Sequence, residues 1–301
     1  MVFIVLDLEW NGAPLYKTGG YFNEIIEFGA VKLNDSLEIT DSFQALVKPT
    51  VHKKLTGRVK RLTHISNDAL RAEKNFVQTF KQFREWVGGE ENCFMTWGTG
   101  DILVLIENLE RYGLPGVPDL ADNYCDAQEL CQRKLGIERS QQPGLSAVAE
   151  MIGLTCEEME MHRALDDSRV SAVCLKRLWD DGLFRQLLYK ADDEFIRRLT
   201  FKTVFLSDIE NPLIKPEMFV HDCPACGTPM TLEGEIVPRN RSFSATYYCP
   251  TCDRRLIGRH QFKLKYDGLE PKCSFREPAP EVSEPLTDAD EPVGSDPAET
   301  A

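Results

Sequence analysis

The sequence predicts a mixed-sheet α/β domain, followed by a small β-rich cysteine module and a disordered acidic tail. Three observations support this fold class. An apolar run opens the chain, strand-like segments come first and then alternate with helix-like ones, and two CxxC pairs lie beyond residue 220. Alternating strands and helices favour a sheet covered by helices. The 301 residues, 42% of them hydrophobic, are enough for about two domains.

The expected strands and helices follow from local patterns in the first part of the chain. Residues 2–9 are apolar on both faces until the acids begin, which is typical of a central strand in a covered sheet. Pro14 and the Gly19-Gly20 pair indicate a loop over residues 12–20, and residues 34–36 indicate a turn between strands. We expect the other strands at 25–33, 42–47 and 93–97. Helices are expected at 75–87, 101–112, 145–152 and 165–181, and Gly182 should end the last of these. A further helix should follow residues 119–126 and end at residue 134.

The net charge of −13 at first argues against a nucleic-acid partner, because phosphate binding usually requires a basic surface. The charge is uneven, however. Residues 277–301 hold eight acids, five prolines and no base, which predicts a disordered tail. Residues 216–276 hold nine basic and seven acidic residues. We therefore expect an α/β domain at 1–190, a connecting segment at 191–215, a cysteine module at 216–276 and the tail, and the charge of the whole chain does not exclude nucleic acid.

The chain carries no signal for a membrane or for export. No apolar run approaches the ~18 residues of a membrane span, and the first residues lack the basic region of a secretory signal. We therefore expect no membrane partner and a cytoplasmic location. In that compartment the scattered cysteines should be reduced and mostly buried.

Two carboxylates lie two residues apart at the end of the first strand. Asp7 and Glu9 therefore project from one face of the sheet. Buried side by side they repel each other and lose hydration, unless a cation lies between them. Oxygen ligands of this kind suit Mg²⁺ or Mn²⁺. The alternative is that the strand ends at Leu6 and both acids are solvated.

Two further sites carry acids at the starts of expected helices. Asp101 follows Trp97-Gly98 between a strand and a helix, and His162 and Asp167 lie five residues apart where the last helix begins. Taken singly, each has an ordinary explanation: a first-turn Asp that favours the helix dipole, an exposed loop histidine, or, for Trp97, a core residue.

Taken together, these residues predict hydrolytic chemistry. Four carboxylates can bind two divalent ions, and a histidine that titrates near neutrality can deprotonate a metal-bound water. Such a set of groups suits in-line phosphodiester hydrolysis, in which two ions about 3.5–4 Å apart stabilise the attacking and leaving oxygens. The candidate residues are Asp7, Glu9, Asp101, Asp167 and His162.

At these positions the sequence resembles the DEDDh 3′–5′ exonucleases. Val5-Leu6-Asp7-Leu8-Glu9 matches the first motif of that family, and the following string EIIEFGAV at 24–31 is also typical of it. Asp101 matches the second motif, and His162 with Asp167 matches the third, H-x4-D. The Trp-Gly before Asp101 and the string HRALDD at 162–167 are most similar to Eri1-like exoribonucleases and KapD-like bacterial exonucleases. The resemblance covers about residues 1–182.

The resemblance implies an RNase H-like fold for a DEDDh exonuclease domain at 1–190, two Mg²⁺ or Mn²⁺ ions, and release of nucleoside 5′-monophosphates from a 3′ end. It assigns the general base to His162 and metal binding to the four matched carboxylates, while Asp166 is unmatched and should matter less. Many proofreading members carry Thr after the first-motif Glu, where this chain has Trp10. Trp10 either contacts the terminal base of the substrate or fills the core, and we favour the contact with the substrate.

The cysteine module predicts one structural Zn²⁺. Two CxxC pairs separated by 22 residues supply four thiolates, which close a tetrahedral shell and leave no open position for catalysis. The ion should supply most of the folding energy of so small a module. His221 and His260 are alternative ligands that the two pairs make unnecessary, and Cys273 is expected to be a free thiol. The four predicted ligands are Cys223, Cys226, Cys249 and Cys252.

The same module predicts contact with nucleic acid, because basic residues alternate with aromatic ones. Such a pattern can pair with phosphates and stack on bases. The alternatives are a solvated basic ribbon whose aromatics form its core, or a module that docks a protein partner. The basic candidates are Arg241, Arg254, Arg255, Arg259 and Lys263, and the interleaved aromatics include Phe243, Tyr247, Tyr248, Phe262 and Tyr266.

The function predicted from these features is a metal-dependent 3′–5′ exonuclease acting on single-stranded nucleic acid, with RNA favoured over DNA. The RNA preference depends on the subgroup resemblance alone. The alternatives are a DNA exonuclease for repair or proofreading, a nucleotide pyrophosphatase, and a non-catalytic nucleic-acid-binding protein built on a nuclease scaffold.

Overall fold

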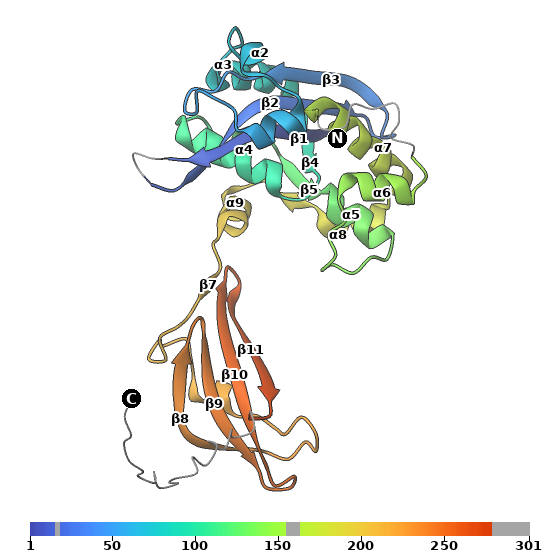
Figure 1. Ribbon diagram of the computed structural model, residues 1–301. Helices are drawn as coiled ribbons and strands as arrows, with labels where there is room; N and C mark the ends of the chain where they lie inside the picture. Colours follow the sequence, from blue (N-terminus) through green and yellow to red (C-terminus); the bar gives the residue numbers. More distant parts are fainter. Residues whose placement is uncertain (16–18, 155–162, 279–301) are drawn as a thin grey trace, which may run out of the picture. The chain divides into compact units, whose positions relative to one another are not determined.

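The computed structural model describes residues 1–15, 19–154 and 163–278 (Figure 1). His162 and the predicted acidic tail from residue 279 onward lie outside the described residues. The chain divides into two compact units, Met1–Thr200 and a second that begins at Phe201. Within the described ranges, no helix has both the length and the apolar composition needed to cross a membrane.

The first unit is built on a six-stranded mixed sheet with strand order β3-β2-β1-β4-β5-β6. β1 pairs antiparallel with β2 and parallel with β4, so it is a central strand, as its apolar sequence predicts. The antiparallel β1-β2-β3 part follows from short turns, and the parallel β1-β4-β5 part requires crossover helices. The strands are β1 (Val2–Pro14), β2 (Tyr21–Leu33), β3 (Ile39–Leu46), β4 (Asn92–Thr96), β5 (Asn123–Asp126) and β6 (Tyr189–Lys190).

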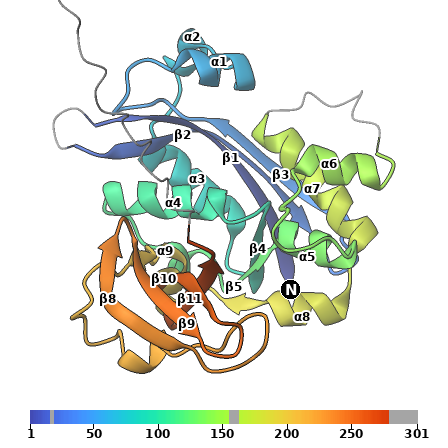
Figure 2. The same ribbon diagram turned by 60° about the horizontal axis from the view of Figure 1, so that its bottom comes forward.

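Helices cover both faces of this sheet, which confirms the α/β prediction (Figures 1 and 2). Residues of α3, α4 and α9 pack with Ile4, Leu6 and Leu8 of β1 in one core. Residues of α5, α7 and α8 pack with Phe3 and Val5 in a second core on the opposite face. The helices are α1 (Gly57–Thr63), α2 (Asn67–Leu70), α3 (Phe76–Val87), α4 (Gly100–Arg111), α5 (Ala127–Lys134), α6 (Leu145–Met151), α7 (Ala164–Leu178), α8 (Asp181–Leu187) and α9 (Asp193–Thr200).

The structure corrects two of the expected boundaries. The loop expected over residues 12–20 is shorter, because β1 continues to Pro14 and β2 begins at Tyr21, with paired backbones on both sides. Gly182 does not end a helix; it lies in the first turn of α8, which begins after Asp180 caps the Leu183 N–H at 3.0 Å. An N-cap carboxylate outweighs the helix-breaking tendency of a nearby glycine.

The register of β1 and β2 shifts next to the predicted site. Glu9 pairs with Glu27, whereas the next residue, Trp10, pairs with Ile25, so Ile26 is a bulge residue. Ile26 packs in a separate small cluster with residues that precede and follow α1. Because of the bulge, β2 contributes side chains to the core beneath β1 and also contacts the segment that contains α1, beside the site.

The second unit is an antiparallel sheet with strand order β11-β10-β9-β8, and β7 pairs with β10 (Figure 1). Its buried residues form two small clusters rather than one large core. So little buried apolar surface indicates that the unit needs another source of stability. The strands are β7 (Val204–Phe205), β8 (Thr231–Arg239), β9 (Ser242–Cys249), β10 (Arg254–Lys265) and β11 (Gly268–Arg276), and a 3-10 turn, η3, spans Pro216–Phe219.

Candidate active site

The alternation of side chains along β1 places Asp7 and Glu9 on the face that packs against α7. The strand does not end at Leu6, so the alternative of two solvated acids beyond the strand is wrong. Both carboxylates are partly buried in the middle of this central strand, just beyond the residues that pair with β4. The geometry predicted from their spacing is therefore the geometry observed.

Helix α7 brings Asp167 to these two acids. One oxygen from each of Asp7, Glu9 and Asp167 can be chosen so that all three lie within 4.8 Å of one another. The helix approaches β2 closely at Gly29, where a Cβ atom would overlap the backbone of Ala164 and Leu165. The Ser168 hydroxyl also donates a 2.8 Å hydrogen bond to the Gly29 carbonyl. The absence of a side chain at Gly29 thus allows α7 to lie close to β2, and this close approach brings Asp167 near Asp7 and Glu9.

A buried ion pair fixes the first turn of α7. The Glu27 side chain is fully buried on β2, directly opposite Glu9. It accepts hydrogen bonds from Arg163 at 2.6–3.2 Å and from the Ala164 N–H at 3.4 Å. This contact joins residues 136 positions apart in the sequence, and no local pattern reveals it. Glu27 and Arg163 are therefore positioning residues that the sequence analysis missed.

Asp101 reaches the site from the other side of β1. It lies in the first turn of α4, is 6% exposed, and accepts a 2.9 Å hydrogen bond from the Leu8 N–H. Thr99, not Asp101, occupies the N-cap position. The contact with the β1 backbone, rather than a helix cap, therefore holds this carboxylate beside Asp7.

The carboxylates strongly perturb one another. Burial, together with the charges of Asp101 and Asp167, raises the pKa of Asp7 well above its usual range. Burial and the charges of Asp167, Glu27 and Asp101 raise the pKa of Glu9 to about 8, and burial raises that of Asp101 to about 7. Four acids share this site, and Arg163 is the base whose charge opposes the shift at Glu9. Such a cluster of oxygen donors is suited to divalent cations.

The carboxylates line a cleft of about 430 Å³. Trp10 lies in its wall and also packs against the core beneath β1, so it has both of the positions considered for it. Residues of β2 and of α1 complete the lining, and no sequence pattern had predicted α1. Other lining residues include Tyr21, Asn23, Thr56, Arg58 and Leu62.

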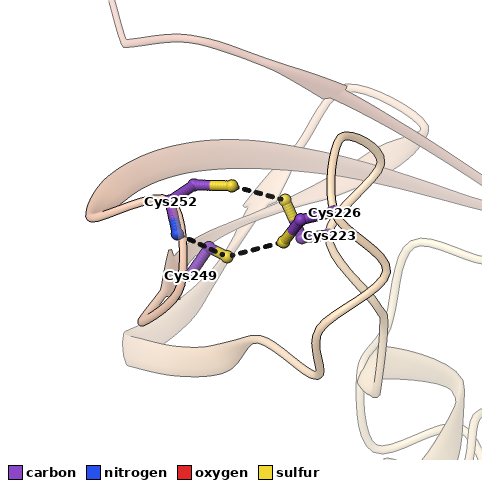
Figure 3. A group of neighbouring side chains, drawn as sticks. All are labelled: Cys223, Cys226, Cys249 and Cys252. Carbon is purple, nitrogen blue, oxygen red and sulfur yellow. Dashed lines mark hydrogen bonds between the residues drawn. The ribbon is translucent and has the colours of Figure 1, made fainter.

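In the second unit, the four cysteines of the CxxC pairs converge (Figure 3). Their sulfur atoms all lie within 4.8 Å of one another, with Cys226 and Cys249 3.5 Å apart and Cys223 and Cys252 3.9 Å apart. A hydrogen bond from the backbone of Ala225 is the main cause that lowers the pKa of Cys223 to about 6. The thiolate form that binds metal is therefore already favoured at one ligand.

The predicted basic residues do not form one surface. Arg255, Arg259 and Lys263 lie on the same face of β10. Arg254 lies instead beside the cysteines, with its guanidinium 4.0 Å from Cys223 Sγ. The Arg241 guanidinium and the Lys263 ammonium lie over the Phe205 ring, at 5.7 and 5.5 Å from its centroid.

Most of the predicted aromatic residues of the module are not available to stack on bases. Phe243, Tyr247 and Phe262 are buried in its cores, so that part of the nucleic-acid interpretation is wrong for these three. Tyr248 is the aromatic that shares the basic face, with the Arg255 guanidinium 5.5 Å from its ring centroid.

Comparison with known proteins agrees with this site. A family model described as Exonuclease (RNase_T) matches residues 4–175. Rat 3′-5′ exoribonuclease 1 is 30% identical over 169 residues, which cover 54% of this chain and 48% of the rat protein. The DNA polymerase III PolC-type of Staphylococcus saprophyticus is 29% identical over 170 residues, 56% of this chain and 11% of that protein. The chain therefore spans about half the length of the first relative and far less of the second.

A solved structure of a DEDDh family member has a similar fold. The nuclease domain of 3′hExo, a DEDDh family member bound to rAMP, superposes with a TM-score of 0.53 at 26% identity, covering 60% of this chain and 93% of that one. The mixed sheet and its carboxylate cleft thus define an RNase H-like nuclease fold of the DEDDh type. Within that class, this chain belongs to the exonuclease (RNase_T) family.

Proposed function

We propose that the protein is a metal-dependent 3′–5′ exonuclease acting on single-stranded nucleic acid, with RNA as the preferred substrate. The observation that carries the proposal is the convergence of Asp7, Glu9, Asp101 and Asp167 in one cleft. The likeness to 3′-5′ exoribonuclease 1 and to a nuclease domain bound to rAMP supports the choice of RNA. The PolC-type relatives are of similar identity, and they support DNA as the second candidate.

The four carboxylates would hold two Mg²⁺ or Mn²⁺ ions. When bound, such ions neutralise the acidic cluster and stabilise charge on the attacking and leaving oxygens of a phosphodiester. The protein itself contributes orientation. The Glu27–Arg163 pair and the Leu8 N–H hold Asp167 and Asp101 in place, and Trp10 and Arg58 lie in the cleft wall where a base and a phosphate would fit.

The substrate proposal is tested with 5′-labelled single-stranded RNA and DNA of the same sequence. We expect a ladder that shortens from the 3′ end in Mg²⁺ or Mn²⁺, faster for RNA, and no shortening in EDTA, because the unneutralised carboxylates would repel the phosphates. Faster shortening of DNA would select the second candidate. Binding without shortening of either strand would overturn the enzyme proposal in favour of a binding protein.

His162 is proposed as the general base. It lies outside the described residues, but its neighbour Arg163 is anchored on Glu27 beside Glu9. We expect His162→Ala to lower kcat by about 10²–10⁴-fold at saturating Mg²⁺, with little change in KM, because a positioned base contributes that much to proton transfer.

The pH profile separates this role from a structural one. Wild-type kcat should fall as the pH drops through the histidine range, near 6.5, and this fall should be absent in His162→Ala. His64→Asn is the matched control, because His64 is exposed and is not one of the residues that line the cleft, and it should leave the rate unchanged. An unchanged acid limb in His162→Ala would assign the proton to another group.

We also propose that Cys223, Cys226, Cys249 and Cys252 bind one structural Zn²⁺. The support is the convergence of four thiols in a unit with little core. We expect Cys226→Ser to lose the zinc bound by the four cysteines and to unfold the second unit, because a structural zinc contributes about 10–16 kcal/mol of apparent binding energy in small domains.

Elemental analysis and limited proteolysis after residue 200 measure the two effects. Thr251→Ala lies between the second pair of cysteines with an exposed side chain, and it should keep the wild-type zinc content. Retention of wild-type zinc by Cys226→Ser would refute the four-cysteine site.

A further inference from the structure

A second group of potential metal ligands lies in the same unit and shares no residue with the four cysteines. His221, His260 and Cys273 each offer one atom, and these atoms all lie within 4.8 Å of one another. His221 follows η3, His260 is on β10, and Cys273 is its directly paired neighbour on β11. The Cys273 sulfur is 3.8 Å from His260 Nε2. Three separate segments of chain therefore bring two imidazoles and a thiol to one point.

One member of the group is buried, and another carries a buried nitrogen with no hydrogen-bond partner. His260 is 1% exposed. The His221 Nε2 atom is buried without a hydrogen-bond partner among the described residues. A buried polar atom left unpaired destabilises the folded state, so such atoms are rare in folded proteins without a bound group.

Aromatic packing accounts for the position of the His221 ring, but it gives the Nε2 atom of that ring no hydrogen-bond partner. The His221 ring lies 5.0 Å from the His260 ring and 5.4 Å from the Phe275 ring, between centroids. Contacts of this kind between aromatic rings are not hydrogen bonds to a nitrogen atom. They provide no donor for the in-plane lone pair of Nε2, which a metal ion would satisfy.

The hydrogen bonds around His260 allow metal binding. The Tyr247 hydroxyl is 2.9 Å from His260 Nε2 and 3.0 Å from the Phe219 carbonyl oxygen. A hydroxyl has one proton, and when Tyr247 donates it to the Phe219 carbonyl, Nε2 accepts no hydrogen bond from Tyr247. In the His260 tautomer that carries its proton on Nδ1, the lone pair of Nε2 can then bind a metal.

The three residues also share a cavity. His221, His260 and Cys273 all line a space of about 210 Å³, together with Glu217 and Lys272. This space is large enough for a water molecule or a small donor group beside the three side chains.

We propose that His221, His260 and Cys273 form a second zinc site, with its fourth position open to this cavity. Imidazole and thiolate together suit Zn²⁺ among the common cellular cations. Three protein ligands with an open fourth position are typical of sites that take water or an exogenous donor, unlike the closed four-cysteine site. The proposal is independent of the nuclease activity, because it uses no residue of the carboxylate cleft.

The test counts zinc and thiolate ligands in the full-length protein. With the carboxylate cleft saturated by excess Mg²⁺, we expect two zinc equivalents per wild-type chain and one in Cys273→Ser. After exchange for Co²⁺, the sulfur-to-cobalt charge-transfer absorbance reports thiolates alone. It should fall by about a fifth in Cys273→Ser, as the ligand thiolates fall from five to four. His221→Asn should also reduce the zinc count to one.

Ser274→Ala is the matched control, because Ser274 is the exposed neighbour of Cys273 on β11 and should retain two equivalents. Circular dichroism verifies that each variant is folded. A wild-type protein with one tightly bound zinc would overturn the proposal without reference to any variant. An unchanged zinc count in both folded Cys273→Ser and folded His221→Asn would overturn it equally.

Discussion

Replacing Asp7 with Asn is expected to lower kcat by on the order of 10³-fold or more, while raising the thermal stability of the metal-free protein. The rate falls because Asp7 is a proposed metal ligand, and burial together with the charges of Asp101 and Asp167 raises its pKa well above its usual range in the metal-free site. An amide keeps the shape of the side chain but supplies no negative charge to balance a divalent cation. The two effects have opposite signs, which distinguishes loss of the site from misfolding.

The stability change follows from the pKa shifts. In the folded, metal-free protein the pKa of Glu9 is about 8 and that of Asp101 about 7, against ordinary values of 4.5 and 3.8. Between these limits the folded state binds more protons than the unfolded state, so stability falls as the pH rises from about 4 to 8. Removing the charge at Asp7 should restore part of that loss at pH 8, roughly 1–2 kcal/mol, or a few degrees in Tm.

Thermal unfolding in EDTA at pH 5 and pH 8, with and without added Mg²⁺, measures this change. A ligand that binds only the folded state raises the Tm. Since Asp7→Asn should bind Mg²⁺ more weakly, Mg²⁺ in excess of the EDTA should raise the Tm of the wild type at pH 8 more than that of the variant. Asp166→Asn is the matched control: Asp166 is adjacent to Asp167 in sequence but pairs with Arg169 at 3.2 Å, and its loss should spare activity. Equal loss of activity in both variants would contradict the assignment.

Local sequence patterns predicted those parts of the fold that depend on residues close together in the sequence or on a motif of fixed geometry. The apolar run at residues 2–9 and the two-residue spacing of Asp7 and Glu9 were sufficient to place two carboxylates on one face of a central strand. The CxxC spacing likewise predicted which four sulfur atoms meet. In both cases the partners are close in sequence or belong to a motif with a fixed geometry.

Contacts between distant, unpatterned residues could not be predicted in this way. A glutamate such as Glu27 in an apolar strand shows no sign of its partner 136 residues away. The short helix α1 has few apolar residues, so its periodicity is weak, although it forms one wall of the cleft. His260 and Cys273 become neighbours only through the register of β10 and β11, which no spacing rule specifies.

Gly29→Ala is expected to damage both the fold and the site, although no atom of Gly29 is a candidate ligand. The added Cβ would overlap the backbone of Ala164 and Leu165, which cannot move aside as a flexible side chain would. Helix α7 must therefore shift away from β2 and weaken the hydrogen bond from Ser168 to the Gly29 carbonyl. Overpacking of this kind costs about 1–3 kcal/mol or more.

The activity loss should exceed what the stability change explains. A displacement of about 1 Å at Asp167 can lower the rate by about 10²-fold, so kcat should fall by that order in the folded variant, with a smaller change in KM. Gly89→Ala is the matched control, because a Cβ there meets nothing within 4 Å, and it should retain the wild-type rate and Tm. If Gly29→Ala were destabilised but retained the wild-type kcat below its Tm, the close approach of α7 to β2 would be a packing feature alone, and the position of Asp167 would be set by the Glu27–Arg163 pair instead.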